Sequence, residues 1–189
     1  MGDVVVVTGP PGSGKSAVGS ALADLLDPSV LLEADWFFGR WRTGAVDPWR
    51  PEAAPQTAHA GRAALAATVE FARSGAWVVY DGVLDRAATT DLAALAREAG
   101  VAVHRVVLLP PVDACLARVA ARTGHGFDDP GATQDMHAAF AADAESTGDA
   151  AVLRDDGAPA DRLAERVRDL LRAGALRVQV RVPTGGARP

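Results

Sequence analysis

The sequence predicts an α/β fold in which helices cover both faces of a central parallel sheet of five strands. Short apolar runs rich in valine and leucine alternate with longer segments of helical periodicity. Polar residues, glycine or proline follow these runs, as expected where buried strands end in turns. Because parallel strands direct their carboxyl ends to one edge of a sheet, ligands should bind beyond that edge.

Five apolar runs are the expected strands. The first leads into a glycine loop, the second and third end at acidic residues, and the fourth stops at Pro110-Pro111. The runs are Val4–Val7, Val30–Leu32, Trp77–Tyr80, Val101–Leu109 and the weaker Ala150–Leu153. Residues 175–183 alternate in polarity, which predicts a half-exposed edge strand, and residues 184–189 should form a frayed tail.

Six helices are expected between and after these runs. Their apolar residues recur every three or four positions, so that Val18, Leu22, Leu25 and Leu26 share one face of the first helix. The expected helices are Ala17–Leu26, Pro55–Arg73, Ala87–Ala99, Val112–Arg122, Ala132–Ala144 and Ala160–Leu171. With 189 residues and 49% hydrophobic content, the chain is most simply one domain spanning residues 1–189.

Composition argues against several classes of partner. The net charge of −5 and the pI near 5.3 disfavour binding to nucleic acid or to an anionic membrane. No apolar run approaches the roughly 20 residues that a membrane span needs. Cys115 is the only cysteine, which excludes an intrachain disulfide, and no signal-peptide pattern precedes the first strand. We therefore expect a cytoplasmic protein, either monomeric or homodimeric.

Lys15 is the most informative residue, because the other eighteen basic residues are all arginine. It lies in Gly9-Pro10-Pro11-Gly12-Ser13-Gly14-Lys15-Ser16, which fits the phosphate-binding pattern G-x-x-x-x-G-K-[ST] between a strand and a helix. The glycines let backbone N–H groups turn toward one anion at the start of the helix. Lys15 can reach the β- and γ-phosphates, and the Ser16 hydroxyl can bind Mg²⁺. The segment from Gly9 to Ala17 is therefore the expected site for ATP and Mg²⁺.

The rest of the chain separates the classes of protein that carry such a loop. A switch GTPase uses an N-K-x-D signature, and this chain has no asparagine. It also lacks the L-S-G-G-Q-like signature of ABC ATPases, and it is short for an AAA+ motor. Residues 3–172 resemble the small-molecule P-loop kinases, most closely the chloramphenicol phosphotransferase-like antibiotic kinases, and more distantly gluconate, shikimate and nucleoside monophosphate kinases. This resemblance implies a three-layer P-loop sandwich with an arginine-bearing lid.

Two aspartates follow expected strands, and the resemblance implies roles for them. Asp35 corresponds to an aspartate that accepts the proton of the acceptor hydroxyl in the antibiotic kinases, where the attacking oxygen must be oriented for in-line transfer. It could instead cap a helix that begins near Trp36. Asp81 resembles a Walker B-type acid that supports Mg²⁺ together with Ser16, or it could position the acceptor.

Two arginines resemble those of the kinase lid. Arg118 and Arg122 are four residues apart and would share one face of a helix. The resemblance implies that they neutralise charge on the transferred phosphoryl group, and that a lid over about residues 118–135 excludes water. A solvated basic face paired with Asp128 and Asp129 is the alternative.

The same resemblance completes the nucleotide site and the catalytic set. Arg118 would also contact the nucleotide, and the backbone of Asp155 and Gly157, after the fifth strand, would cradle adenine. Lys15, Asp35 and the two lid arginines would be the catalytic residues.

The segment of residues 36–60 should bind the acceptor. Five of the ten aromatic residues fall within fourteen positions here, with arginines between them. They are Trp36, Phe37, Phe38, Trp41 and Trp49. Some must pack inward, but so dense a cluster beside glycine and proline favours a mobile insert that holds a ring-bearing, apolar molecule. The residues expected to contact the acceptor are Asp35, Trp36, Phe38, Trp41, Arg62, Asp81 and Arg86.

Arg86 bears on the choice of acceptor. It follows Asp81-Gly82-Val83-Leu84-Asp85, which is similar to the Asp-Gly-Phe-Pro-Arg of nucleoside monophosphate kinases but lacks the proline and places the arginine one residue later. We therefore expect an ATP- and Mg²⁺-dependent phosphotransferase that acts on a hydroxyl of a small organic molecule, such as an antibiotic or related secondary metabolite. The alternatives are a nucleoside, nucleotide or primary-metabolite kinase, and a regulatory NTP-binding module without transfer activity.

Overall fold

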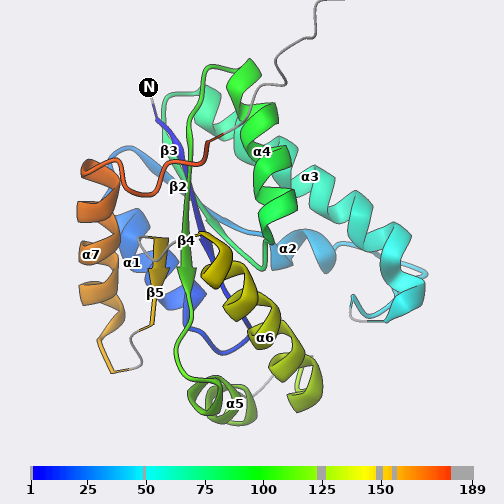
Figure 1. The fold of residues 1–189 in the computed structure, drawn as a ribbon. Coiled ribbons are helices and arrows are strands. Elements are labelled where there is room, and N and C mark those ends of the chain that lie inside the picture. The colour runs from blue at the N-terminus through cyan, green and yellow to red at the C-terminus, as the bar shows by residue number, and fades with distance from the viewer. Residues whose placement is uncertain (1, 49, 123–126, 148–150, 155–156, 180–189) are drawn as a thin grey trace, which may run out of the picture.

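The computed structural model describes residues 2–48, 50–122, 127–147, 151–154 and 157–179. Within these ranges, five parallel strands form one sheet in the order β2-β3-β1-β4-β5 (Figure 1). The strands are β1 (Val4–Thr8), β2 (Ser29–Glu33), β3 (Trp77–Asp81), β4 (Val103–Leu108) and β5 (Val152–Leu153). Each of the five expected runs overlaps one of these strands, so the predicted parallel α/β sheet is confirmed.

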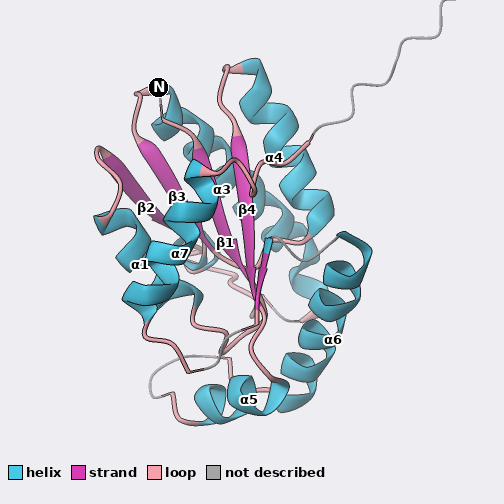
Figure 2. Cartoon of the chain, turned by 60° about the vertical axis from the view of Figure 1, so that its left-hand side comes forward, coloured by secondary structure: helices cyan, strands magenta, loops and turns pink. Residues whose placement is uncertain are grey.

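Helices cover both faces of the sheet. Helices α1 and α7 pack on one face, and α3, α4 and α6 lie on the other (Figure 1). The helices are α1 (Lys15–Asp24), α2 (Asp35–Phe38), the 3-10 turn η1 (Pro51–Ala53), α3 (Ala54–Arg73), α4 (Arg86–Glu98), α5 (Val112–Ala120), α6 (Pro130–Thr147) and α7 (Ala160–Arg172). The strands run toward the end of the molecule where α5 lies (Figure 2). In the ranges described, no helix is both long and apolar enough to cross a membrane.

The position of β1 explains why its sequence is a continuous run of valines. Successive side chains of a strand point to opposite faces of the sheet. Val4 and Val6 belong to the core under α3 and α4, whereas Val5 and Val7 belong to the core under α1 and α7. All four are fully buried. The strand is therefore apolar on both faces, as strands in the middle of a parallel sheet usually are.

The insert and the C-terminal segment differ from the prediction. The insert contains the short helix α2, whose four residues are too few to carry a periodic pattern. The described part of the expected edge strand at residues 175–183 makes only one antiparallel bridge, between Arg177 and His104. Because β5 already pairs with the end of β4, this segment can pair only with the start of β4. Residues 180–183 of that strand, and the expected tail at 184–189, lie outside the described residues.

Thr8 connects the end of β1 with the loop that follows β3. Its buried hydroxyl donates a hydrogen bond to the carbonyl oxygen of Leu84 (3.1 Å) and accepts one from the Leu84 N–H (2.9 Å). The two residues are 76 positions apart in the chain. Since the glycine loop begins at the next residue, Gly9, these two bonds fix the loop relative to the end of β3.

We expect Thr8→Val to lower the free energy of unfolding by about 1–3 kcal/mol, because it leaves a buried N–H and a buried C=O of Leu84 without their partner. Thr8→Ser keeps the hydroxyl, so its free energy of unfolding should fall much less. Urea denaturation followed by circular dichroism measures both values. Equal losses in the two variants would contradict a role for the hydroxyl.

Candidate active site

The phosphate loop, residues 9–16, joins β1 to α1 at the carboxyl end of the sheet. Two of its glycines are packed too tightly to carry a side chain. A Cβ on Gly9 would lie 2.2 Å from the carbonyl oxygen of Leu108, and a Cβ on Gly12 would lie 2.3 Å from that of Cys115. Gly12 also has a φ of +76°, which other residues rarely adopt. The loop is therefore held between the end of β4 and helix α5.

Lys15 is the first residue of α1, and its ammonium turns back into the loop. Its Nζ donates a hydrogen bond to the carbonyl oxygen of Pro10 (3.0 Å). Burial lowers the pKa of Lys15 to about 8, against the opposing effect of the carboxylates of Asp81 and Asp35, and the charge of Arg122 adds to the lowering. A partly buried positive charge thus lies at the positive end of a helix, where an anion is stabilised.

Asp81 ends β3 and is only 7% exposed. Its carboxylate accepts a hydrogen bond from the Ser16 hydroxyl. Burial raises the pKa of Asp81, and this bond together with the charge of Lys15 opposes the rise. The predicted metal pair is thus brought together. Glu33, which pairs in register with Asp81 from β2 and also raises its pKa, was missed by sequence reasoning, although it ends the neighbouring strand.

Asp35 lies beside this pair. The N–H of Ala34 donates to the carbonyl oxygen of Asp81 (2.9 Å), which fixes the chain just before Asp35 against the end of β3. Asp35 is the first residue of α2, and Ala34 occupies the N-cap position, so the alternative that Asp35 caps this helix is wrong. Its side chain is exposed, and its charge raises the pKa of both Lys15 and Asp81. The exposed carboxylate of Asp35 thus lies near the charges of Lys15 and Asp81.

The two predicted lid arginines are placed differently from each other. Arg118 lies in α5, and its Nη1 donates to the carbonyl oxygen of Gly12 (3.3 Å). The prediction that Arg122 shares a helical face with Arg118 is wrong, because α5 ends at Ala120. The glycine-containing sequence that follows favours such an ending. Arg122 nevertheless lies close enough to Lys15 for its charge to lower the pKa of that residue.

Asp129 has a local role in the helix that follows. Its Oδ1 accepts a hydrogen bond from the N–H of Ala132 (3.0 Å) at the start of α6. This is the geometry of a helix cap, and it stabilises the first turn. The alternative in which Asp129 neutralises a lid arginine therefore has no support in the described contacts.

The acceptor insert exposes some of its aromatic side chains and buries others. Trp36 is 55% exposed and Trp41 is 42% exposed. Phe37 and Phe38 are half-buried against the core under α3 and α4. The Trp36 ring contacts Phe37 edge-on, with 5.2 Å between centroids, and the Arg40 guanidinium lies 4.5 Å from the centroid of the Trp36 ring. Phe38 therefore anchors the insert, and the two tryptophans form its accessible aromatic surface.

Arg86 and Arg62, both expected to contact the acceptor, have partners on the protein. Arg86 begins α4, and its Nε donates to Oδ1 of Asp143 in α6 (2.6 Å). Asp143 also accepts a hydrogen bond, through Oδ2, from Nη2 of Arg105 in β4 (2.9 Å). Arg62 is exposed on α3, with its Nη2 2.9 Å from Nδ1 of His59. The side chain of Arg86 is thus held toward α6.

Some of the expected site lies outside the described residues. Trp49 of the insert, residues 123–126 of the lid and Asp155 of the adenine loop belong to this group. Gly157 is described, and it is exposed between β5 and α7.

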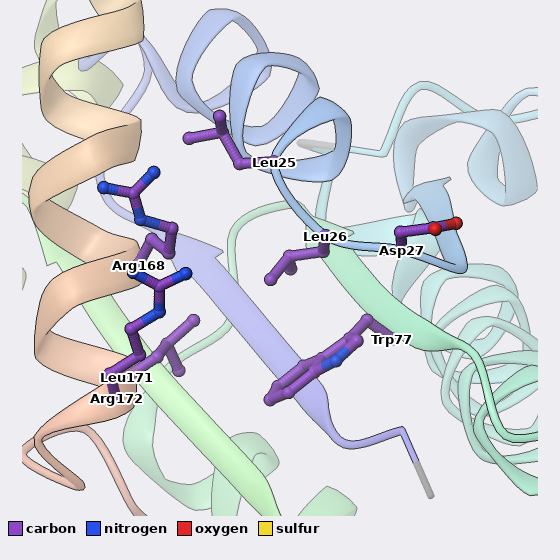
Figure 3. A pocket seen from close by; sticks show the side chains of 7 residues that line it. All are labelled: Leu25, Leu26, Asp27, Trp77, Arg168, Leu171 and Arg172. Atoms are coloured by element: carbon purple, nitrogen blue, oxygen red, sulfur yellow. The ribbon is translucent and has the colours of Figure 1, made fainter.

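A cavity of about 370 Å³ lies away from this site (Figure 3). It is lined by Leu25, Leu26, Asp27, Trp77, Arg168, Leu171 and Arg172. Trp77 begins β3, and Leu171 is near the end of α7. The cavity therefore lies at the amino end of the sheet, opposite the phosphate loop, and plays no part in the site described above.

The glycine loop and the order of the parallel strands define a P-loop NTPase fold. The chain belongs to the AAA domain family AAA_33, whose model matches residues 4–147. No curated protein matches the sequence significantly. Several solved structures of similar fold are kinases of small molecules, among them a sugar kinase and a gluconokinase.

Three solved structures illustrate the similarity. The tunicamycin resistance protein of Deinococcus radiodurans is 18% identical, with 95% of this chain and 99% of that chain covered and a TM-score of 0.66. Shikimate kinase from Acinetobacter baumannii, in complex with shikimate, is 20% identical, with coverage of 92% and 95% and a TM-score of 0.61. The Mycobacterium tuberculosis APS kinase CysC, in complex with AMPPNP and APS, is 18% identical, with coverage of 90% and 98% and a TM-score of 0.62. The predicted resemblance to these kinases is confirmed at the level of the fold, which the chain shares with them over more than 90% of its length, and the family match is consistent with it.

The lowered pKa of Lys15 predicts that ATP affinity depends on pH. The ammonium form binds phosphate, and below pH 8 this form predominates, so affinity should be highest there. As the pH rises through 8, the free protein loses this proton, and affinity should fall by up to roughly tenfold per pH unit, until the higher pKa of Lys15 in the complex is reached. Isothermal calorimetry with ATP between pH 7.5 and 9.5 would measure this decline.

Lys15→Arg is the control for this measurement, because a guanidinium stays charged over the whole range. Any affinity that this variant retains should not change with pH. An equally flat profile for the wild-type protein would rule out a titrating Lys15.

Proposed function

We propose that the chain is an ATP- and Mg²⁺-dependent phosphotransferase that transfers the γ-phosphate of ATP to a hydroxyl group of a small organic molecule. One observation supports this most: Asp35, Asp81 and Arg122 come from three separate segments, and the charge of each lies close enough to Lys15 in the phosphate loop to shift its pKa. Lysine and arginine stabilise phosphoryl oxygens, and a carboxylate can orient an attacking hydroxyl. The arrangement would therefore provide both stabilisation of the phosphoryl charge and orientation of the attacking hydroxyl.

The loop is suited to the phosphates of ATP. The side-chain oxygen of Ser13 is buried and has no hydrogen-bond partner among the described residues. The first N–H groups of α1 have no partner within the helix and can donate to an anion. Residues 9–17 would hold the phosphates, and the backbone near Asp155 and Gly157 would hold adenine.

Ser16 and Asp81 are suited to Mg²⁺, because this ion prefers oxygen ligands and usually keeps several waters and phosphate oxygens. In the described ranges, no group of three or more His, Cys, Asp or Glu side chains gathers to hold a metal. The protein would therefore supply few ligands, with Asp81 acting directly or through water. When bound, the ion neutralises part of the phosphate charge.

Asp35 is the proposed general base. As the acceptor oxygen attacks, its proton passes to a carboxylate oxygen of Asp35, which also orients that oxygen. Lys15 and Arg122 stabilise negative charge on the transferred group. Arg118 positions the loop through its bond to Gly12 and can also contact the nucleotide.

The accessible surface of the insert supports a ring-bearing acceptor. Trp36 directly follows Asp35, Trp41 comes shortly after it, and both side chains are exposed; aromatic side chains of this kind can bind flat, apolar molecules. The segment from Asp81 to Arg86 departs from the Asp-Gly-Phe-Pro-Arg pattern of nucleoside monophosphate kinases, which disfavours a nucleotide as the acceptor. An antibiotic or related secondary metabolite fits this surface best, and the name of the Deinococcus radiodurans tunicamycin resistance protein agrees with such a role.

We further propose that the protein acts in the cytoplasm as a monomer or homodimer. Its partners would be ATP and the acceptor, and its net charge of −5 argues against nucleic acid and anionic membranes.

Acceptor-dependent release of ADP tests this function. The protein, with ATP and Mg²⁺, is offered ring-bearing antibiotics, nucleosides and sugar acids, and mass spectrometry identifies the phosphorylated product. Asp35→Asn should lower the transfer rate by about 10² to 10⁴ and change ATP affinity little, because general-base help acts on the attacking hydroxyl. Lys15→Ala should lower the rate of phosphoryl transfer by roughly a hundredfold or more.

Asp91→Asn is the matched control, since it neutralises an exposed aspartate of α4 away from the loop. It should retain the wild-type rate. ATP binding without acceptor-dependent turnover would instead favour a regulatory module. A normal rate in Asp35→Asn with collapsed ATP affinity would place Asp35 in the nucleotide site.

Trp36→Ala should weaken acceptor binding by up to a few kcal/mol, roughly the value of a lost aromatic contact, and leave ATP affinity unchanged. Saturable quenching of tryptophan fluorescence measures acceptor affinity. Phe71→Ala removes an exposed aromatic side chain near the end of α3 and should have no effect. If the two variants bind the acceptor equally well, the insert is not an acceptor surface.

A further inference from the structure

A second cavity, of about 340 Å³, lies where the start of α4, the middle of β4, β5 and the segment after α7 meet. Its polar lining consists of Arg86, Arg105, Arg177, Thr89, Thr90 and Gln179. The other described residues that line it are apolar, and none of the described lining residues is acidic. We call this cavity the arginine pocket.

Arg105 is the unusual member of this lining. It lies in β4, all six residues of which are buried, and it is itself only 8% exposed. Burial lowers the pKa of Arg105, and the charge and hydrogen bond of Asp143 oppose this. A guanidinium remains protonated under such conditions. Its Nε has no hydrogen-bond partner among the described residues. The pocket is therefore lined in part by a buried guanidinium, and buried charged groups with an unpaired donor are rare in folded proteins.

Asp143 shows that an oxyanion fits between two of these arginines. Its carboxylate accepts hydrogen bonds from Arg86 (2.6 Å) and from Arg105 (2.9 Å). Burial alone would raise the pKa of Asp143, but these two arginines hold it below its usual value. Among the described residues that line the pocket or bond to its arginines, Asp143 supplies one negative charge for the guanidiniums of Arg86, Arg105 and Arg177. Asp85, a second described acid whose charge acts on Arg105, accepts the N-cap hydrogen bond of α4.

We propose that the arginine pocket binds an anionic small molecule through a phosphate or carboxylate group, at a site separate from the phosphate loop. Arg86, Arg105 and Arg177 would donate charge-assisted hydrogen bonds to the oxyanion. Arg105 projects to the same face of β4 as Val103 and Val107, which pack under the helices of the α3, α4 and α6 side. The phosphate loop leads into α1 on the opposite face, so the two sites are distinct.

Occupancy of the pocket also bears on α6. An anion would share Arg86 and Arg105 with Asp143, which belongs to this helix. Because Asp143 would share these arginines with the anion, binding would change the contacts that hold α6 against β4. Helix α6 also contains residues 130–135, the end of the predicted lid segment.

Titration with inorganic phosphate and sulfate tests the proposal. Because the phosphate loop also binds such anions, the titration uses the Lys15→Ala protein and, separately, wild-type protein saturated with AMPPNP. Isothermal calorimetry should detect one remaining anion site in both. Arg86→Ala and Arg177→Ala, introduced into Lys15→Ala, should each weaken it by on the order of tenfold, as expected for a lost charged hydrogen bond.

Arg97→Ala is the matched control, because it removes an exposed arginine from the last turn of the same helix, outside the pocket. It should bind phosphate and sulfate like its parent. Arg177 is exposed, so its loss should leave the fold intact, and thermal unfolding verifies this. The proposal is overturned if the remaining site is absent, or if Arg86→Ala and Arg177→Ala bind as tightly as Arg97→Ala.

Discussion

The partly buried positive charge of Lys15 is the constraint on which the rest of the site depends. An ammonium in a protein interior is destabilising unless opposite charges or dipoles compensate it. The carbonyl group of Pro10 and the carboxylates of Asp35 and Asp81 provide this compensation, yet the pKa of Lys15 still falls to about 8. The compensation is therefore incomplete in the free protein. A polyphosphate at the start of α1 would complete it, so the site is electrostatically prepared for an anion before one binds.

The topology of the sheet explains how these groups come together. Because β1 pairs with both β3 and β4, the segments that follow these three strands meet at one edge. Gly9 packs against Leu108 at the end of β4, and Asp81 at the end of β3 bonds to Ser16. The hydrogen bond from the Ala34 N–H to the Asp81 carbonyl oxygen then holds the end of β2 at this edge, and Asp35 follows directly. Strand order thus determines which side chains share the phosphate site, although they are far apart in the sequence.

The parts of the molecule that depend on local pattern can be predicted from the sequence. Burial on both faces leaves β1 as an unbroken valine run, and the close approach of backbone at Gly9 and Gly12 requires glycine. The direction of Arg86 cannot be predicted in this way, because its partner Asp143 lies 57 residues later. An alternating pattern at residues 175–183 shows that one face is buried, but it does not reveal how much of β4 remains available for pairing.

Lys15, which is partly buried, and Arg105, which is buried, differ in chemistry, and this difference limits what each cation can do. Lys15 can lose its proton near pH 8, so its charge responds to whatever partner is present. Arg105 cannot, because a guanidinium keeps its proton even where burial lowers its pKa. A permanent charge inside a fold requires a permanent counterion, which Asp143 supplies from α6. The described hydrogen bond of the Lys15 ammonium is to a neutral carbonyl, that of Pro10, rather than to a fixed counterion. This gives a physical reason for the only lysine of the chain to stand at a loop that we propose binds and releases ATP.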